Sequence, residues 1–388
     1  MWGLITSLND ILIPHLKAAF TLSYVQATLI QMSFFGAYFV MSLPSGWLVE
    51  RIGYRFGIVV GLAIAGAGCV LFYPAAAAAW YPLFLGALFV LASGITLLQV
   101  AANPYVTILG PPHTASSRLT LTQAFNSAGT VIGPYLGGWF ILSAIPRATP
   151  QAEAAAVQMP YLGLATVLFV IALVFLSLRL PVARESTAVD AQNAHADDAR
   201  SVWAYRHLLL GVIAIFVYVG GEVAIGSLLV NFMADPSIGG LSTEVAGRYY
   251  LPLYWGGAMV GRFIGAGAMW RHVRPGRALA FNAAVAIGLL LVAIASAGKI
   301  AMWAVLAVGL CNSIMFPTIF ALAIQGLGIH TGKGSGFLCM AIVGGATVPV
   351  VQAYVADHVG LLQSFAVPVV CYLYIVYYGI SGHRPLRR

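Results

Sequence analysis

Charge is the property that this sequence has least of. Only 8% of its 388 residues are Asp, Glu, Lys or Arg, whereas 61% are hydrophobic. A soluble protein of this length needs a far more polar surface, so the composition argues against one. Hydrophobic runs of roughly 20 residues match the thickness of a bilayer, because a helix rises about 1.5 Å per residue. These runs do not alternate with polar residues, which argues against an outer-membrane barrel.

Cysteine is also scarce, and all four residues fall inside hydrophobic runs: Cys69, Cys311, Cys339 and Cys371. No two of them have the spacing of a metal site, so we interpret them as small buried hydrophobic residues rather than ligands or disulfides. No nucleophile triad, zinc-ligand set or phosphate-binding loop is visible. The histidines all map to loops or helix ends, which argues against a histidine proton relay. We therefore expect no enzymatic activity, no metal and no cofactor.

Twelve hydrophobic segments predict an all-α membrane protein. They are 2–18, 24–49, 56–74, 82–109, 118–143, 159–180, 205–233, 244–270, 276–296, 300–327, 333–356 and 361–380. The polar stretch 181–204 has no hydrophobic period and is typical of a flexible linker. It divides the chain into two six-helix halves, 1–180 and 205–388. The first helix is at the lower length limit for a span, so we expect the natural start to lie upstream of Met1; the alternative is local bilayer thinning.

The distribution of basic residues predicts the orientation in the membrane. If the N-terminus is cytoplasmic, most Lys and Arg fall in or beside cytoplasmic loops. The exceptions are Lys17, Arg147, Arg248, Lys299 and the intramembrane Arg262. Both termini and the central linker are therefore predicted to be cytoplasmic. The net charge of +8 is then a topology signal, and no nucleic-acid partner is expected.

Three charged side chains fall where the bilayer is expected, away from the ends of the predicted spans: Asp10, Glu222 and Arg262. Such a charge costs about 2.5 to 3.5 kcal/mol and is retained mainly where it faces a polar pathway. A carboxylic acid there can bind and release a proton, and carboxylates also bind hard cations such as Na⁺. Asp10 and Glu222 are therefore candidates for cation coupling, and Arg262 is a candidate gating counter-charge. The alternatives are a solvated Asp10, a structural Glu222–Arg262 pair and a snorkelling Arg262.

The loop after the second predicted helix carries the most specific pattern. Residues 46–57 read GWLVERIGYRFG, in which Gly46 allows close helix approach and Gly53 permits a tight turn. Its charged cluster consists of Glu50, Arg51 and Arg55. Such a cluster can lock one conformation and release it in another, although ordinary positive-inside anchoring is the alternative. The loop resembles the signature G-x-L-x-D/E-R-x-G-x-R/K of the major facilitator superfamily, which implies a rocker-type transporter with a central site.

Further stretches resemble the fucose–glucose/galactose–H⁺ symporter family. They are SLNDILIP (7–14), LQVAANPYVTILGP (98–111), LTQAFNSAG (121–129), YVGGEVAIGSLLVNF (218–232), FPTIFALAI (316–324) and YYGISG (377–382). The resemblance implies that Asp10 takes part in proton coupling and sugar binding. The fucose branch has a Glu where this chain has Gln99, so Gln99 and the sequence around Glu222 look more like the glucose/galactose branch. Glu222 is then a candidate for the second carboxylate that Gln99 cannot supply.

A sugar site needs amides and carboxylates for paired hydrogen bonds and aromatic rings for stacking. The candidates for substrate binding are Asn9, Gln31, Gln99, Gln123, Asn126, Glu222, Asn312 and Trp255. Buried amides also join helices to each other in membranes, which is the alternative for each of them. Gln123 and Asn126 are three residues apart and therefore share one helix face.

Together these observations predict a twelve-helix secondary transporter in the bacterial inner membrane. We expect it to import a hexose of the glucose/galactose or fucose type with H⁺ or Na⁺, by alternating access and as a monomer in the lipid bilayer. The alternatives are an exporter of another small solute in the same fold and a sugar sensor that transports nothing.

Overall fold

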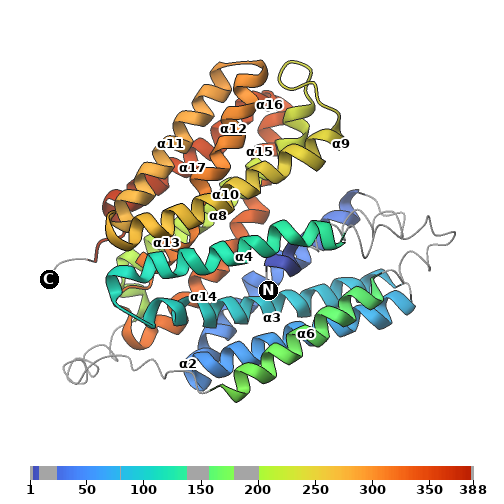
Figure 1. Cartoon of the computed structure of the whole chain (residues 1–388), viewed down its shortest axis with the longest axis vertical. Helices are drawn as coiled ribbons and strands as arrows, with labels where there is room; N and C mark the ends of the chain where they lie inside the picture. Colours follow the sequence, from blue (N-terminus) through green and yellow to red (C-terminus); the bar gives the residue numbers. More distant parts are fainter. Residues whose placement is uncertain (1–2, 8–23, 79, 138–156, 179–200, 386–388) are drawn as a thin grey trace. The chain divides into compact units, whose positions relative to one another are not determined.

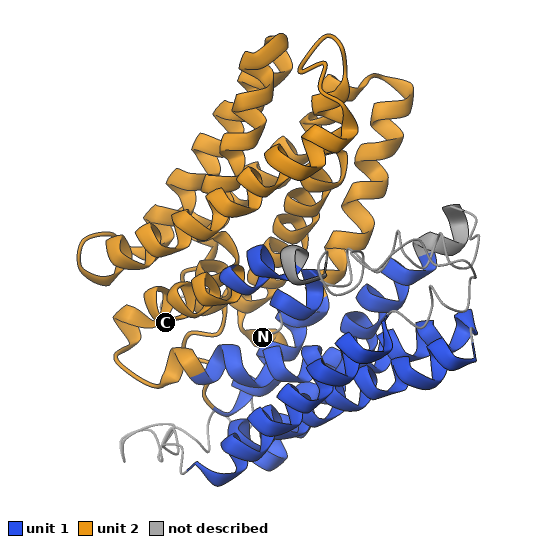
Figure 2. Ribbon diagram, turned by 45° about the vertical axis from the view of Figure 1, so that its right-hand side comes forward, with its two compact units in different colours: residues 1–105, 128–192, 329–340 blue, residues 106–127, 193–328, 341–388 orange. Residues whose placement is uncertain are grey.

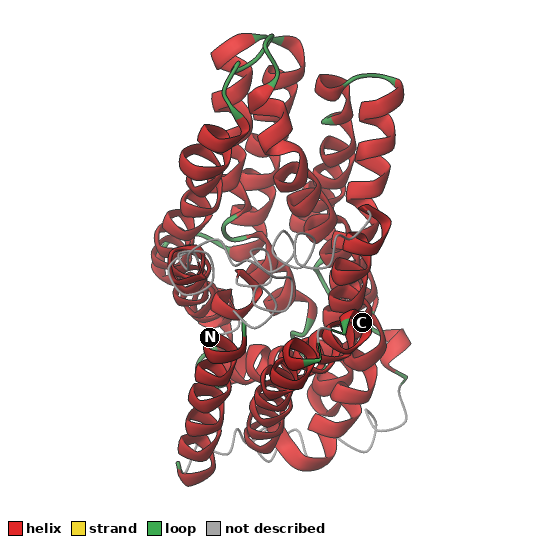
Figure 3. Cartoon of the chain, turned by 90° about the vertical axis from the view of Figure 1, so that its right-hand side faces the viewer, coloured by secondary structure: helices red, strands yellow, loops and turns green. Residues whose placement is uncertain are grey.

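The computed structural model describes residues 3–7, 24–78, 80–137, 157–178 and 201–385. Every regular element in those residues is helical (Figure 3), which confirms the predicted all-α class. Two predicted site residues, Asn9 and Asp10, lie outside the described residues. So do most of the first predicted helix, the end of the fifth and the predicted linker up to residue 200.

The first half of the chain contains four long described helices (Figure 1). They are α2 (Tyr24–Ala77), α3 (Tyr81–Ile108), α4 (Ala115–Gly137) and α6 (Gln158–Ser177). The second and third predicted helices both lie within α2, where they are separated by non-helical backbone at Gly53, whose φ is 79° and ψ 164°. That positive φ is accessible to glycine without the strain that a side chain would bring. The predicted tight turn is therefore a kink between two helices.

The second half contains more of the described helices. They are α8 (Arg206–Ala234), α10 (Leu251–Arg271), α11 (Pro275–Ala295), α12 (Gly298–Asn312), α13 (Met315–Ala323), α14 (Thr331–Met340), α15 (Gly344–His358) and α17 (Ala366–Tyr377). Two short helices, α9 (Thr243–Val245) and α16 (Leu361–Ser364), precede α10 and α17. The end of the predicted linker is ordered as a 3₁₀ turn, Val202–Ala204, whose first turn is capped by the Ser201 side chain.

Three predicted helices, 300–327, 333–356 and 361–380, are interrupted rather than continuous. Proline explains two of the breaks, because it has no N–H to donate to the carbonyl four residues earlier. Pro317 leaves the Ser313 carbonyl without a helical donor between α12 and α13, and Pro368 does the same for Ser364 before α17. Between α14 and α15 the chain forms a 3₁₀ turn, Ala341–Val343, directly before two glycines that have low helix propensity.

The described helices form two compact units that do not follow the two halves of the chain (Figure 2). Unit 1 contains residues 1–105, 128–192 and 329–340, and unit 2 contains residues 106–127, 193–328 and 341–388. As a result α14, from the second half, belongs to unit 1, and the first part of α4 belongs to unit 2.

Small residues allow the helices of unit 1 to approach closely. A Cβ added to Gly61 of α2 would lie 2.8 Å from the backbone nitrogen of Leu98 in α3, and Gly94 of α3 meets the backbone of Ala65 in the same way. Toward the other end of α2, Phe72 stacks on Tyr161 of α6 with ring centroids 4.1 Å apart. Close backbone approach of this kind is how membrane helices gain packing energy without a hydrophobic driving force.

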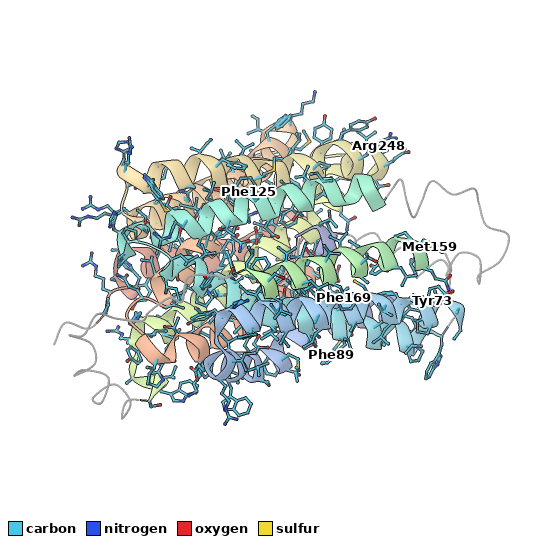
Figure 4. All side chains as sticks on the ribbon, turned by 60° about the horizontal axis from the view of Figure 1, so that its bottom comes forward. Tyr73, Phe89, Phe125, Met159, Phe169 and Arg248 are labelled. Carbon is cyan, nitrogen blue, oxygen red and sulfur yellow. The ribbon has the colours of Figure 1, made fainter. Side chains whose placement is uncertain are left out.

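Large apolar side chains cover the outer surface of the helices (Figure 4). Phe125 in unit 2 is 67% exposed and Met159 in unit 1 is 74% exposed. Eight helical segments in the described residues are long and apolar enough to cross a membrane. Met159 lies on one of these segments, Gln158–Ser177, where exposed apolar surface is compatible with lipid rather than water.

Candidate functional site

Asn312, the last residue of α12, joins four helices of unit 2. The Tyr372 hydroxyl of α17 donates to its side-chain oxygen at 2.6 Å, and its amide nitrogen donates to the Tyr254 hydroxyl of α10 at 2.8 Å. The Tyr218 hydroxyl of α8 donates to its main-chain oxygen at 3.0 Å. All four side chains are buried. The amide is therefore satisfied by protein groups, and its predicted contact with sugar stays a prediction.

Glu222 of α8 lies beside this cluster. Its main-chain oxygen accepts a hydrogen bond from Tyr254 at 3.4 Å, and its carboxyl group lies next to the Tyr218 hydroxyl and interacts electrostatically with Arg262. Such interactions are strong in a low-dielectric interior. Glu222 and Arg262, 40 residues apart in the sequence, thus belong to one polar network.

Arg262 of α10 connects that network to two further segments. Its Nε donates to the Ser313 carbonyl oxygen at 3.0 Å, at the break between α12 and α13, and its Nη1 donates to the Ser127 hydroxyl of α4. Ser313 and Ser127 are both almost completely buried. The guanidinium is therefore held by groups inside unit 2.

A stripe of glycines on α10 makes these contacts possible. Gly257, Gly261 and Gly265 recur every four residues and face residues 309–314. A Cβ on Gly261 would lie 2.6 Å from the Ser313 hydroxyl oxygen. This stripe was not predicted from the sequence, although its repeated G-x-x-x-G spacing is typical of close helix contacts in membranes.

Trp255 follows Tyr254 on α10 and packs against α8. Its ring meets the Tyr254 ring edge-to-face with centroids 5.1 Å apart. One edge of the indole would be 3.1 Å from a Cβ placed on Gly226, which is one helical turn beyond Glu222. The predicted stacking residue therefore packs against α8, the helix that carries the predicted coupling carboxylate.

The remaining predicted amides are divided between the units. In unit 2, Gln123 of α4 is buried and its main-chain oxygen accepts from the Ser127 hydroxyl at 2.9 Å, while Asn126 is partly exposed. In unit 1, the buried Gln99 of α3 donates to the Tyr38 hydroxyl of α2 at 2.6 Å. Gln31, also on α2, has an exposed side chain.

Glu50 is the residue of the charged loop motif that reaches α14. Its Oε1 accepts the backbone N–H of Lys333 at 2.9 Å, and its Oε2 pairs with the Lys333 Nζ at 3.2 Å. Lys333 is in the first turn of α14, where a negative charge is favoured by the helix dipole. Glycines make room for the contact, since a Cβ on Gly46 would lie 2.8 Å from the Gly332 oxygen.

The two arginines of the motif have other partners within unit 1. The Arg51 guanidinium lies 3.6 Å from the centre of the Trp47 ring, which is a cation–π contact. Arg55 donates from Nε to the Phe175 carbonyl at 3.2 Å and from Nη2 to the Leu176 carbonyl. It therefore caps the C-terminal end of α6, where a cation is favourable.

Metal ligands do not gather in the described residues. No group of three or more His, Cys, Asp and Glu side chains there could hold a metal ion. The polar groups that do gather are a carboxyl, a guanidinium, hydroxyls and amides, which suit proton transfer and hydrogen bonding to polar solutes.

Apolar helices, glycine-mediated packing, charged residues within predicted spans and an ion pair at a helix end are features of an integral membrane transporter. The Major Facilitator Superfamily pattern matches residues 2–348, and the chain belongs to that superfamily. It is 59% identical to the glucose/galactose transporter of Brucella abortus over 384 residues, covering 99% of this chain and 92% of the relative.

Two further comparisons extend the likeness to a characterised fold. The chain is 34% identical to the L-fucose-proton symporter of Escherichia coli, covering 97% of this chain and 89% of the relative. It also matches the crystal structure of the major facilitator transporter FucP in the outward conformation, with a TM-score of 0.86, 34% identity, and 97% and 95% of the two chains covered. The predicted resemblance to this family and its fold is confirmed.

Proposed function

We propose that this protein imports a hexose of the glucose/galactose or fucose type together with H⁺ or Na⁺, by alternating access. The observation that carries the proposal is the 59% identity, over 99% of the chain, to a protein named as a glucose/galactose transporter. The name of the more distant L-fucose-proton symporter supports a cation-coupled sugar importer. The protein would act as a monomer without a cofactor, in the inner membrane, with both termini in the cytoplasm.

Cation coupling is assigned to Asp10 and Glu222. Glu222 supports the assignment by its place in unit 2, where its carboxyl group lies next to the Tyr218 hydroxyl and interacts with the Arg262 guanidinium. A carboxyl group in such surroundings can carry a proton through the membrane interior and release it. The assignment of cation coupling to Asp10 rests only on its place in the NDILIP motif.

Sugar binding is assigned to the polar groups along α3, α4, α8, α10 and α12. Gln123 and Asn126 share a face of α4, and Trp255 offers a ring next to the turn that follows Glu222. Sugar hydroxyls pair with amides and carboxyls, and the C–H face of a sugar packs on aromatic rings. Gln31, Gln99, Asn312 and Asn9 complete the proposed set.

Gating is assigned to the loop motif and to Arg262. The bond of Glu50 to the first turn of α14 is the contact that a conformational change would break and remake, because it joins helices from the two halves of the chain. Gly46 and Gly53 shape α2 for that contact, Arg55 holds the end of α6, and Arg51 stacks on Trp47.

Uptake by purified protein in proteoliposomes tests the proposal. Labelled D-glucose, D-galactose and L-fucose are offered with an imposed pH gradient or an imposed Na⁺ gradient. We expect one of the sugars to accumulate above its external concentration under one of the gradients. Exchange without accumulation would contradict cation coupling, efflux alone would favour an exporter, and sugar binding without flux would favour a sensor.

A further inference from the structure

The Ser313 carbonyl lacks the backbone N–H donor that a regular helix would provide. The residue four positions later is Pro317, which has no N–H, and the helix is interrupted between Asn312 and Met315. A buried carbonyl needs a donor from elsewhere. Arg262 provides it from α10, with its Nε 3.0 Å from the Ser313 oxygen.

Arg262 simultaneously fixes α4. Its Nη1 donates to the Ser127 hydroxyl, which itself donates to the Gln123 main-chain oxygen. One guanidinium therefore joins α10, the break between α12 and α13, and the helix that carries Gln123 and Asn126. In the described structure it makes these two bonds rather than a bond to the Glu222 carboxyl group.

Glu222 faces a defined set of titratable and charged groups. They are Tyr218 on its own helix, Tyr254 and Arg262 on α10, and Tyr372 on α17. At neutral pH tyrosines are uncharged, so Arg262 is the cation of this set. If the Glu222 carboxyl group loses its proton here, the resulting carboxylate is unfavourable without an ionic partner. A guanidinium is attracted more strongly to this carboxylate than to a neutral carbonyl or hydroxyl group.

We propose that Arg262 is a switching counter-ion that exchanges partners as Glu222 gains and loses its proton. With Glu222 protonated, Arg262 holds the Ser313 carbonyl and the Ser127 hydroxyl, as in this structure. When the carboxyl O–H bond breaks and the proton passes to water, the guanidinium turns to the carboxylate and releases the helix break and α4. This deepens the proposed function, on which it rests, by naming the residue that transmits protonation to the substrate-facing helices.

The exchange makes a directional prediction for Ser127. Replacing it by Ala removes one of the two partners that compete with Glu222 for Arg262, so the deprotonated state becomes easier to reach. A hydrogen bond to a charged group is strong enough that the midpoint of Glu222 deprotonation should fall by about one pH unit. The matched control is Ser117→Ala, which removes another serine hydroxyl bond between α4 and α10, to the Ala266 carbonyl, without touching Arg262.

Infrared titration of the protonated carboxyl band in sugar-free proteoliposomes is the test, with the Glu222 signal defined by subtracting the spectrum of Glu222→Gln. We expect the midpoint to fall in Ser127→Ala, to rise in Arg262→Gln and to stay unchanged in Ser117→Ala. If Arg262→Gln does not fold, Arg262→Lys, which keeps the charge without the planar fork, should shift the midpoint upward by a smaller amount.

Two results would overturn the exchange. An unchanged midpoint in Ser127→Ala would mean that Arg262 is a fixed charge, and an unchanged midpoint in both arginine variants would mean that it is no counter-ion. Because the titration contains no sugar, its outcome is independent of the proposed substrate. Failure of the wild-type protein to accumulate any labelled sugar would instead contradict the proposed function.

Discussion

The two units satisfy their polar groups in different ways. In the described part of unit 1, Glu50 binds the start of α14, Arg55 binds the end of α6, and Arg51 stacks on Trp47. In unit 2, Glu222 and Arg262 are charged groups within the helices, connected through three tyrosines, Asn312 and a helix break. The contrast suggests a division of roles: the described charged residues of unit 1 fix helix ends, whereas the network of unit 2 is the one that we propose responds to a proton.

The largest expected effect comes from replacing Glu222, the carboxyl group within the polar network of unit 2. Glu222→Gln keeps the size and most hydrogen bonds of the side chain but cannot release a proton. A proton coupled one-to-one sustains about tenfold sugar accumulation per pH unit, since each unit corresponds to about 1.36 kcal/mol. We expect this accumulation to be lost while sugar exchange at equal pH persists, as measured with labelled D-galactose in proteoliposomes. Retained accumulation would contradict the role of Glu222.

The next largest effect is expected on thermal stability, because both units use glycines to bring helices close together. A Cβ on Gly46 would lie 2.8 Å from the Gly332 oxygen of α14, and one on Gly261 would lie 2.6 Å from the Ser313 hydroxyl. Overpacking of this kind costs about 1 to 3 kcal/mol. We expect both Gly→Ala variants to unfold at lower temperature in detergent, and the Gly261 variant also to change the pH dependence of transport.

Gly36→Ala in α2 is the matched control, since nothing lies within 4 Å of the Cβ that it adds. Its melting temperature should equal that of the wild type. A pH profile altered equally by Gly46→Ala and Gly261→Ala would remove the distinction between the two units.

A smaller effect is expected at the end of α6. Arg55→Ala leaves the carbonyls of Phe175 and Leu176 without their cationic donor. A cap of this kind contributes about 1 kcal/mol at a partly exposed helix end. We expect a modest fall in thermal stability with sugar affinity unchanged; a large loss of affinity would place Arg55 in the sugar site.

The smallest stability effect is expected for the ion pair of unit 1. Lys333 is 45% exposed, and surface ion pairs contribute about 0 to 1 kcal/mol. Lys333→Ala removes this pair but keeps the backbone N–H bond to Glu50. We expect the variant to have nearly unchanged stability and a changed rate of transport. High salt should change the rate of the wild type in the same way. Equal salt dependence in both proteins would contradict a gating role for the pair.

The sequence predicted the helices well because hydrophobic runs and loop residues mark their positions directly. It also predicted that the helices 24–49 and 56–74 are separated at Gly53, where the backbone is not helical. It did not predict that 300–327 would be interrupted. That error has a local cause: Pro317 was visible, but its effect depends on whether another helix supplies a donor to Ser313.

The candidate site was predictable in part. Glu222 and Arg262 stood out because charge within a span is rare. Tyr218, Tyr254 and Tyr372 were not singled out as a network, because tyrosines are common here and only packing shows that three helices direct them to Asn312. Ser127 and Ser313 were missed for the same reason.

The central claim is that the carboxyl group of Glu222 carries the coupling proton, and sugar-induced pH change tests it most directly. Labelled D-galactose is added to lightly buffered proteoliposomes without Na⁺, and the external pH is followed together with uptake. The account predicts external alkalinisation in step with sugar entry for the wild type, and sugar entry without alkalinisation for Glu222→Gln. Equal alkalinisation in the two proteins would contradict it.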